Sequence, residues 1–305
     1  MRVVTLLPSA TEIVCALGVD PVGVSHECDY PERVGTLPAV NRSRVDPDAE
    51  SETINEQVVR AERDHGGVYE IDAELLSRLD PDLIVTQGIC DVCAVDSVLV
   101  EEAVERVGLD CRVLTTDPHG VGNVLEDVER IGAALDRPGR ADSLVTDLES
   151  RIERVRERTE GIESRPRTVV LDWLSPPMVA GHWIPEMVEW AGGEYGMADR
   201  GARSTAREWD SVLAYDPEVL IAAPCGFALE RTVRDRAELT DRPGFADLEA
   251  TRAGAVYAVD GNHYVNRPGP RLVDTLEAFA GLLHPDRFAS DESGFAERLG
   301  TRSVA

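Results

Sequence analysis

The sequence predicts an α/β protein of two lobes with parallel-type sheets, joined by one long helix, with a ligand cleft between the lobes. The chain has 305 residues, more than one ordinary domain requires and about right for two. Short apolar runs alternate with helical patterns along it, as in parallel α/β sheets. A helix-turn-strand unit also occurs twice, which suggests two lobes of related build.

The repeated unit consists of a helix end, an Asp-Pro turn and an apolar strand. It is found at residues 76–85 and again at residues 212–221. The residue before a proline disfavours helical backbone, and an uninterrupted apolar run is typical of a strand buried on both faces of a parallel sheet. The alternative explanation is chance recurrence of a common pattern.

A helical segment separates the two lobes. Apolar side chains recur at helical spacing over residues 121–135 and 141–155, on either side of a Pro-Gly turn. The second helix, from about Arg140 to Thr159, would extend about 30 Å at ~1.5 Å per residue. The expected division is an N-terminal lobe at residues 1–120, a helical connector at 121–164 and a C-terminal lobe at 165–305. One rigid helix would limit the lobes to small relative movements.

The charge of the chain argues against several classes of partner. Acidic residues outnumber basic ones 57 to 31, the formal net charge is −26, and lysine is absent. Nucleic acids and anionic membranes both attract basic surfaces, so neither is expected as a partner. A dense carboxylate surface with arginine in place of lysine resembles the proteins of extreme halophiles. That composition concerns solubility in salt and not the choice of ligand.

The amino terminus shows no recognisable leader, and no stretch approaches the ~20 apolar residues that a membrane helix needs. We therefore expect a cytoplasmic location, or an extracytoplasmic one if a leader has been removed. The six cysteines are too sparse for a disulfide scaffold in a chain of 305 residues, so reduced thiols are expected.

Ligands of open parallel sheets bind at the loops that follow the carboxyl ends of the strands. In the first lobe these loops carry a helix start, a histidine-cysteine segment and a cysteine-rich segment, and in the second they carry aromatic side chains and an arginine. The expected ligand-binding residues are Pro8, Ser9, Ala10, Thr11, His26, Cys28, Asp29, Tyr30, Gln87, Gly88, Cys90, Trp173, Trp183, Phe227, Tyr264 and Arg267.

Several of these residues also have a purely structural interpretation. Ser9 and Glu12 have capping-box spacing, so Ser9 is explained first as a helix cap, although a helix amino terminus also offers N–H groups to a ligand. Trp173 and Trp183 fit core packing as well as the walls of a site for a flat macrocycle. Arg267 fits a contact to a ligand phosphate or a pairing with a surface carboxylate.

A metal site is a further hypothesis. His26, Cys28, Cys90 and Cys93 could form a tetrahedral thiolate site, but a lone CxxC pair is weak support and buried cysteine is the alternative. No motif pairs a nucleophile with a base or cradles a nucleotide phosphate, so no catalytic residue is assigned and no enzyme is expected. A metal- or thiol-dependent enzyme built on these four residues is the alternative.

Five segments together resemble the cobalamin-binding branch of the ABC-transporter solute-binding proteins with a helical backbone. They are residues 6–12, 26–31, 87–93, 216–220 and 266–270, and the likeness extends over nearly the whole chain. The resemblance implies two lobes joined by a long helix and a cobalamin-like corrinoid as ligand, bound for uptake, storage or sensing, with an ABC permease as a possible partner. It also covers proteins that serve haem, iron siderophores or metal ions, so another chelate is the alternative ligand. The missing leader and the cysteine-rich segments set this chain apart from exported members.

Overall fold

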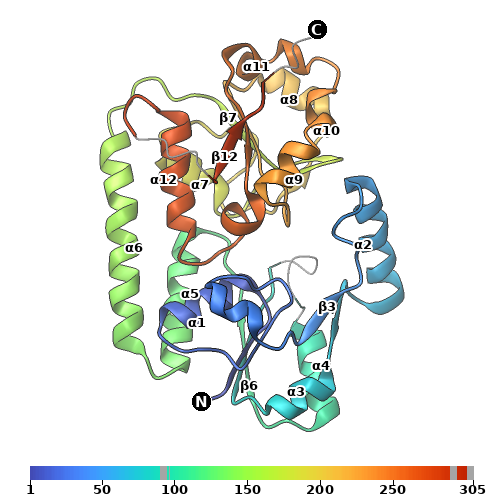
Figure 1. Cartoon of the computed structure of the whole chain (residues 1–305). Coiled ribbons are helices and arrows are strands. Elements are labelled where there is room, and N and C mark those ends of the chain that lie inside the picture. The colour runs from blue at the N-terminus through green and yellow to red at the C-terminus, as the bar shows by residue number, and fades with distance from the viewer. Residues whose placement is uncertain (90–94, 96, 289–293, 301–305) are drawn as a thin grey trace. The chain divides into compact units, whose positions relative to one another are not determined.

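The computed structural model describes residues 1–89, 95, 97–288 and 294–300, and the chain divides into two compact units. Unit 1 comprises Met1–Pro118 and Gly122–Asp147, and unit 2 comprises His119–Val121 and Leu148–Ala305. Each unit has its own sheet of strands connected by helices (Figure 1), which confirms the predicted α/β class. The ligand cleft stays a prediction.

Unit 1 begins with the short strand β1 and ends within the long helix α6. Its elements are β1 (Val3–Thr5), α1 (Pro8–Ala16), β2 (Gly23–Val24), the 3-10 helix η1 (Glu32–Thr36), β3 (Asn41–Ser43), α2 (Ser51–His65), β4 (Tyr69–Ile71), α3 (Ala73–Leu79), β5 (Leu83–Gln87), α4 (Ser97–Val107), β6 (Arg112–Thr116), α5 (Val121–Ala134) and α6 (Pro138–Thr159).

The main sheet of unit 1 is parallel throughout, with strand order β2-β1-β5-β6. Val3 and Val85 point to one face and pack with apolar side chains of α1, α5 and the start of α6. Val4 and Ile84 point to the other face and pack with residues of α2, α3 and α4. Because both faces are covered, the strands are apolar without alternation. Strands β3 and β4, which are separated along the chain by α2, form a separate antiparallel sheet.

Unit 2 contains the second sheet and the C-terminal helices. Its elements are β7 (Thr168–Leu174), β8 (Pro177–Val179), α7 (Ile184–Trp190), β9 (Thr205–Ala206), α8 (Trp209–Tyr215), β10 (Val219–Ala222), α9 (Leu229–Arg234), α10 (Ala237–Thr240), η2 (Phe245–Asp247), α11 (Glu249–Ala253), β11 (Val256–Val259), the π-helix η3 (Gly261–Val265), α12 (Leu272–Leu283) and β12 (Ala296–Arg298).

The sheet of unit 2 is mixed and not purely parallel. Its order is β12-β11-β10-β7-β8-β9, in which β7, β10 and β11 run parallel while β12, β8 and β9 pair antiparallel. The expectation that Trp173 follows a strand was wrong, because β7 continues through Leu174. The reason is that β7 turns into a hairpin in which Trp173 pairs with Met178 of β8.

The predicted Asp-Pro repeat is confirmed as a repeated local structure. Helix α3 ends at Asp80 and helix α8 ends at Asp216, and both residues have left-handed backbone with φ of 43° and 46°. Asp tolerates this conformation better than most non-glycine residues, and the proline that follows prevents further helix. In each unit the next strand, β5 or β10, lies inside the sheet.

The predicted connector helix is present as α6, which has 22 residues. It begins at Pro138, two residues before the expected start, because proline is well suited to the first helical turn. Ala141 and Val145 belong to the core of unit 1. Further along, Arg151 pairs with Asp274 and Glu277 of α12, the helix beside it in Figure 1. One helix therefore contributes to both units.

Within the part of the chain that the structure covers, no helix combines the length and the apolar character needed to cross a bilayer.

Substitution of Leu148 by alanine tests the packing of α6. Leu148 is 3 % exposed, so Leu148→Ala should open a cavity and lower the free energy of unfolding by ~2–5 kcal/mol. The half-buried Leu144 is the matched control, and Leu144→Ala should cost clearly less. Denaturant titration measures both values. Equal losses for the two variants would contradict the packing described for Leu148.

The pH dependence of stability should contain a contribution from Asp127 on α5. Burial raises the pKa of this carboxyl to about 6, although Arg130 opposes the shift through an ion pair of 2.6 Å. Between about pH 4 and pH 6 the unfolded state loses this proton before the folded state does, so the contribution of Asp127 to stability falls as pH rises. Above about pH 6 the carboxyl is charged in both states, and its burial destabilises the folded state by the full amount.

Replacement by the isosteric amide removes this titration. Asp127→Asn should be more stable than the wild type at pH 8, by up to about 3 kcal/mol, and no more stable at pH 4. Chemical denaturation of both proteins at the two pH values gives the comparison. A gain of the same size at both values would show that another effect of the substitution is being measured.

Candidate functional site

The loop after β1 turns directly into helix α1, and the predicted cap at Ser9 was wrong. The capping position is Leu7, which has extended backbone, and Pro8 occupies the first turn; no side chain caps the helix. The helix begins before Ser9 because Pro8 has a fixed φ suited to this position and lacks an N–H group that would need an acceptor.

The amino terminus of α1 presents unused hydrogen-bond donors. No described residue accepts a hydrogen bond from the backbone N–H of Ser9 or Ala10. Both residues are almost fully buried, with exposures of 4 % and 1 %. N–H groups in the first turn of a helix carry partial positive charge and suit an acceptor or an anion.

Thr11 and Cys28 are brought together beside this helix. The Thr11 hydroxyl lies 2.6 Å from the Thr5 hydroxyl and 3.0 Å from the Cys28 thiol sulfur. All three side chains are buried. Cys28 therefore contributes to packing at this edge, while its predicted neighbours Asp29 and Tyr30 are exposed.

His26 follows β2 and is held by Asn41, a residue that the sequence analysis missed. The amide oxygen Oδ1 of Asn41 accepts the His26 backbone N–H at 2.9 Å and lies 3.1 Å from His26 Nδ1. The Asn41 side chain is buried, yet its Nδ2 has no hydrogen-bond partner among the described residues. No sequence signal identifies Asn41, since it begins β3, outside the main sheet, and the contact spans 15 residues.

Gln87, which ends strand β5, also has a buried amide nitrogen without a partner in the described part of the chain. It is 4 % exposed, and its Nε2 also has no partner among the described residues. Gly88, which follows it, donates its N–H to the Thr116 carbonyl of β6 at 2.8 Å. A buried amide without an acceptor is costly, so an acceptor group on a bound ligand would stabilise this position.

Only two of the four predicted metal ligands lie among the described residues. Cys90 and Cys93 lie outside the described residues, so the four-residue site with His26 and Cys28 stays a prediction. Among residues 1–89, 95, 97–288 and 294–300, no group of three or more His, Cys, Asp or Glu side chains could hold a metal ion.

In unit 2 hydrogen bonds join strand β7 to the loop that follows β10, and that loop to the segment that follows β11. Cys225 N–H donates to the Asp172 carbonyl at 2.9 Å, Asn262 N–H donates to the Phe227 carbonyl at 3.0 Å, and Asn266 Nδ2 donates to the Ala223 carbonyl at 3.0 Å. The carboxyl edge of this sheet is thus one connected surface.

The predicted aromatic residues have different environments on this surface. Trp173 and Phe227 meet edge to face with ring centroids 5.3 Å apart, and the Arg231 guanidinium lies 3.6 Å from the Phe227 centroid. Trp183 is 6 % exposed, and its indole N–H donates to the Val265 carbonyl at 2.9 Å. These contacts support core packing for Trp183, one of the two interpretations that the sequence left open.

The remaining predicted residues lie around the π-helix η3. The Tyr264 ring is 5.3 Å from the Phe295 ring. Arg267 is only 4 % exposed, and its Nη2 lies 3.4 Å from Asn262 Oδ1. Arg267 is therefore not a surface residue, and a pairing with a surface carboxylate, one of the two sequence-based interpretations, does not describe it.

The sequence analysis also missed a pair of residues in η3. The Asp260 carboxylate accepts the His263 backbone N–H and the His263 ring Nδ1, each at 2.7 Å. Between them, Gly261 lies so close to the preceding loop that a Cβ there would come within 2.3 Å of the Pro224 carbonyl oxygen. The spacing of the pair, three residues, was visible in the sequence, but the π-helix that orients it was not.

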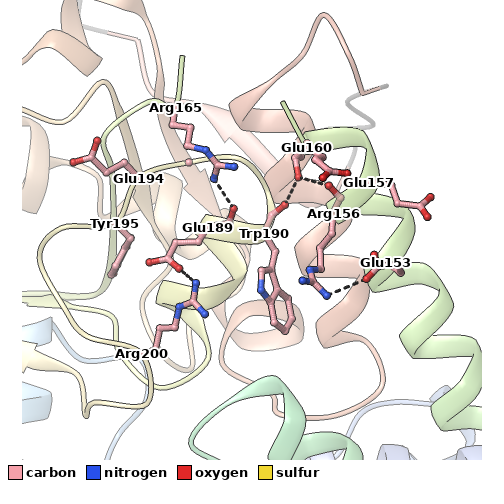
Figure 2. Close-up of a pocket in the computed structure, with 12 residues that line it drawn as sticks. Glu153, Arg156, Glu157, Glu160, Arg165, Glu189, Trp190, Glu194, Tyr195 and Arg200 are labelled. Atoms are coloured by element: carbon pink, nitrogen blue, oxygen red, sulfur yellow. Dashed lines mark hydrogen bonds and ion pairs between the residues drawn. The ribbon is translucent and has the colours of Figure 1, made fainter. Parts of the chain in front are cut away.

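A hollow of about 620 Å³ lies elsewhere in unit 2, among charged side chains of α6 and α7 (Figure 2). Arg156 pairs with Glu153, and Arg200 pairs with Glu189. Glu194, another lining residue, pairs through its backbone with Arg167 at the amino end of β7. Because ligands of parallel sheets bind at carboxyl ends, and because these charges pair with one another, we assign no ligand to this hollow.

The arrangement of parallel strands and connecting loops can be compared with known proteins. The family model described as periplasmic binding protein matches residues 3–262. The chain belongs to this family. Its members are binding proteins, so this chain binds a ligand and is not an enzyme, in agreement with the absence of a catalytic motif.

A relative and two solved structures show similarity over most of the chain. The uncharacterized ABC transporter substrate-binding lipoprotein YvrC of Bacillus subtilis is 24% identical over 295 residues, covering 94% of this chain and 81% of the relative. The periplasmic heme-binding protein RhuT of Roseiflexus is 23% identical with a TM-score of 0.70, covering 93% and 98%. The periplasmic vitamin B12 binding protein BtuF of Vibrio cholerae is 20% identical with a TM-score of 0.66, covering 93% and 96%.

The structures at this level of identity show the fold alone. The names of these proteins describe a lipoprotein and two periplasmic proteins, and they lend no support to the expected cytoplasmic location.

Proposed function

We propose that this chain binds a cobalamin-like corrinoid at the carboxyl edges of its sheets, as the solute-binding component of an uptake, storage or sensing system. The resemblance of five sequence segments to cobalamin-binding proteins supports the corrinoid. The similarity in fold to the vitamin B12 binding protein BtuF agrees with it.

The observation that carries this proposal is the set of unused donors at the edge of unit 1. The N–H groups of Ser9 and Ala10 and the buried amide nitrogens of Asn41 and Gln87 have no acceptor among the described residues. A corrinoid carries amide side chains around its ring, whose carbonyl oxygens are acceptors. Binding would therefore satisfy donors that are costly to leave unpaired.

The carboxyl edge of unit 2 also carries side chains suited to a ligand of this kind. Trp173 is partly exposed, and its ring packs edge to face against the buried Phe227, which lies beside the cationic Arg231. A flat macrocycle with polar substituents requires apolar contact for its faces and hydrogen bonds for its rim.

Haem or an iron-siderophore chelate is the second candidate. The donors of unit 1 would also suit the carboxylates of haem, and one protein of similar fold is named as heme-binding. A membrane permease of the ABC type would be the partner in uptake, since the relative YvrC is named as a transporter substrate-binding lipoprotein.

A panel of chelates tests the choice of ligand. Wild-type protein should gain thermal stability with cobalamin or cobinamide, equivalent to about 2.7 kcal/mol at roughly one hundred times the dissociation constant, and the corrin absorbance should change. Haem and a ferric siderophore complete the panel. Stabilisation by haem or the siderophore alone would select the second candidate, and no response to any of the four would reject the proposed function.

The role of the buried donors is tested by Gln87→Met. Methionine has similar volume but no amide, so corrinoid affinity should fall about tenfold, the loss of one hydrogen bond of roughly 1.4 kcal/mol. Stability without ligand should not fall and should rise if anything, because the substitution removes a buried amide nitrogen that has no partner among the described residues.

The matched control is Gln57→Met on helix α2. The Gln57 side chain accepts the Asp46 backbone N–H at 2.7 Å, and it does not belong to the sheet edge. This variant should retain corrinoid affinity. Isothermal titration of the three proteins gives the comparison, and unchanged affinity in Gln87→Met would remove Gln87 from the site.

A further inference from the structure

We propose that His26 accepts a hydrogen bond from an amide NH₂ group of the bound ligand, with Asn41 as its positioning residue. The edge of unit 1 thereby selects ligands with amide side chains over ligands with carboxylates. This inference rests on the proposed function, because it names the ligand group that the same edge recognises.

The first step is the orientation of the Asn41 amide. One oxygen of this side chain lies 2.9 Å from the His26 backbone nitrogen and 3.1 Å from His26 Nδ1. A backbone N–H group can only donate, so the Asn41 atom that it meets must be the oxygen and not the NH₂ group. The NH₂ group is directed away from this contact, and it is the buried Nδ2 that has no partner among the described residues.

This orientation determines the tautomer of the neutral His26 ring. An amide oxygen can only accept, so Nδ1 carries the hydrogen and donates it to Oδ1 of Asn41. The Ser25 hydroxyl, 3.5 Å from Nδ1, can act as donor or acceptor and is compatible with this assignment. A hydrogen bond at one ring nitrogen fixes the state of the other, and the lone pair is therefore at Nε2.

The imidazole is packed on one side and partly exposed. Tyr69 of β4 lies beside it, with the ring centroids 5.7 Å apart. The side chain of His26 is 28 % exposed, and the Glu27 carboxylate lies 3.9 Å from Nε2, beyond the range of a hydrogen bond. Among the described residues, no group donates a hydrogen bond to Nε2. Nε2 is therefore an acceptor for an incoming N–H group.

His26 belongs to the same sheet edge as the unused donors of unit 1. It follows β2, whereas α1 follows β1 and Gln87 ends β5. These three strands are parallel neighbours in the order β2-β1-β5. Donors that lack an acceptor and an acceptor that lacks a donor therefore occur together on this edge.

This combination matches a primary amide. The carbonyl oxygen of such an amide accepts from the donors, and its NH₂ group donates to Nε2 of His26. A carboxylate satisfies the donors as well, but it has no hydrogen for Nε2, so two lone pairs would face each other. The acceptor thus favours a corrinoid, which carries amides, over haem, whose polar side chains are carboxylates.

Monocarboxylates of cyanocobalamin are the probes, because each differs from the parent by hydrolysis of a single amide. A set that covers each of the primary amides in turn is titrated into wild-type protein by calorimetry at pH 8. At least one member should bind about tenfold more weakly than cyanocobalamin, as expected for the loss of one hydrogen bond.

His26→Phe tests whether this preference comes from the imidazole. Phenylalanine keeps an aromatic ring beside Tyr69 but has no ring nitrogen. The variant should bind cyanocobalamin about tenfold more weakly and should no longer distinguish it from that monocarboxylate. His65→Phe, at the exposed end of α2, is the matched histidine control and should behave as the wild type.

The positioning role of Asn41 can be measured without ligand. Heteronuclear NMR spectra of protein labelled at the histidine ring nitrogens distinguish the two neutral tautomers, and loss of signals in His26→Phe identifies those of His26. The wild type should carry the hydrogen at Nδ1. In Asn41→Ala this nitrogen loses its acceptor, so the hydrogen should move to Nε2. Unchanged signals from the other histidines show that the variant is folded.

The outcomes distinguish this inference from the proposed function. Hydrogen at Nε2 of wild-type His26, equal affinity for cyanocobalamin and all its monocarboxylates, or a preference that persists in His26→Phe would overturn the role of His26 and leave the proposed function intact. An unchanged tautomer in Asn41→Ala would remove Asn41 as the positioning residue. If the wild type binds haem alone, or no member of the chelate panel, the corrinoid proposal fails and this inference fails with it.

Discussion

In each unit a single backbone carbonyl at the start of the sheet sets the register of the central strand. The Arg2 carbonyl, just before β1, accepts the N–H groups of Asp82 and Leu83 at 2.8 and 3.2 Å. The Arg167 carbonyl, just before β7, accepts those of Glu218 and Val219 at 2.8 and 3.1 Å. A slip of one residue would exchange the two faces of the central strand, so these bonds decide which side chains enter each core. The loops that carry the predicted site residues follow the carboxyl ends of these sheets.

The two sheet edges that result differ in chemistry. Unit 1 carries donors beside its sheet: the first turn of α1, Asn41 at the start of β3, and Gln87 at the end of β5. Unit 2 ends its strands in a connected surface of aromatic rings together with the Asp260–His263 pair. Unpaired donors suit acceptor groups of a ligand, whereas aromatic rings suit its apolar parts.

Much of the fold could be predicted because its causes are local. The uninterrupted apolar runs of β5 and β10, the Asp-Pro turns before them and the helical spacing of α5 and α6 are all readable over a few residues. Two predictions were wrong, each for its own reason. Ser9 has capping-box spacing, but Pro8 began the helix earlier, and Trp173 was placed after β7 because the hairpin with β8 depends on a partner strand.

The sequence by itself determined the fold class, the duplicated helix-turn-strand unit, the connector helix and the loops in which the site should be sought. Only the tertiary structure decided which side chains in those loops act together. Asn41 meets His26 through the pairing of separate elements, and Gln87 loses its solvent through burial. Asp260 and His263 are near in sequence, but their contact depends on a π-helix held by the neighbouring loop. Periodicity records which residues are buried, whereas hydrogen-bond partners depend on distances that only the packed chain defines.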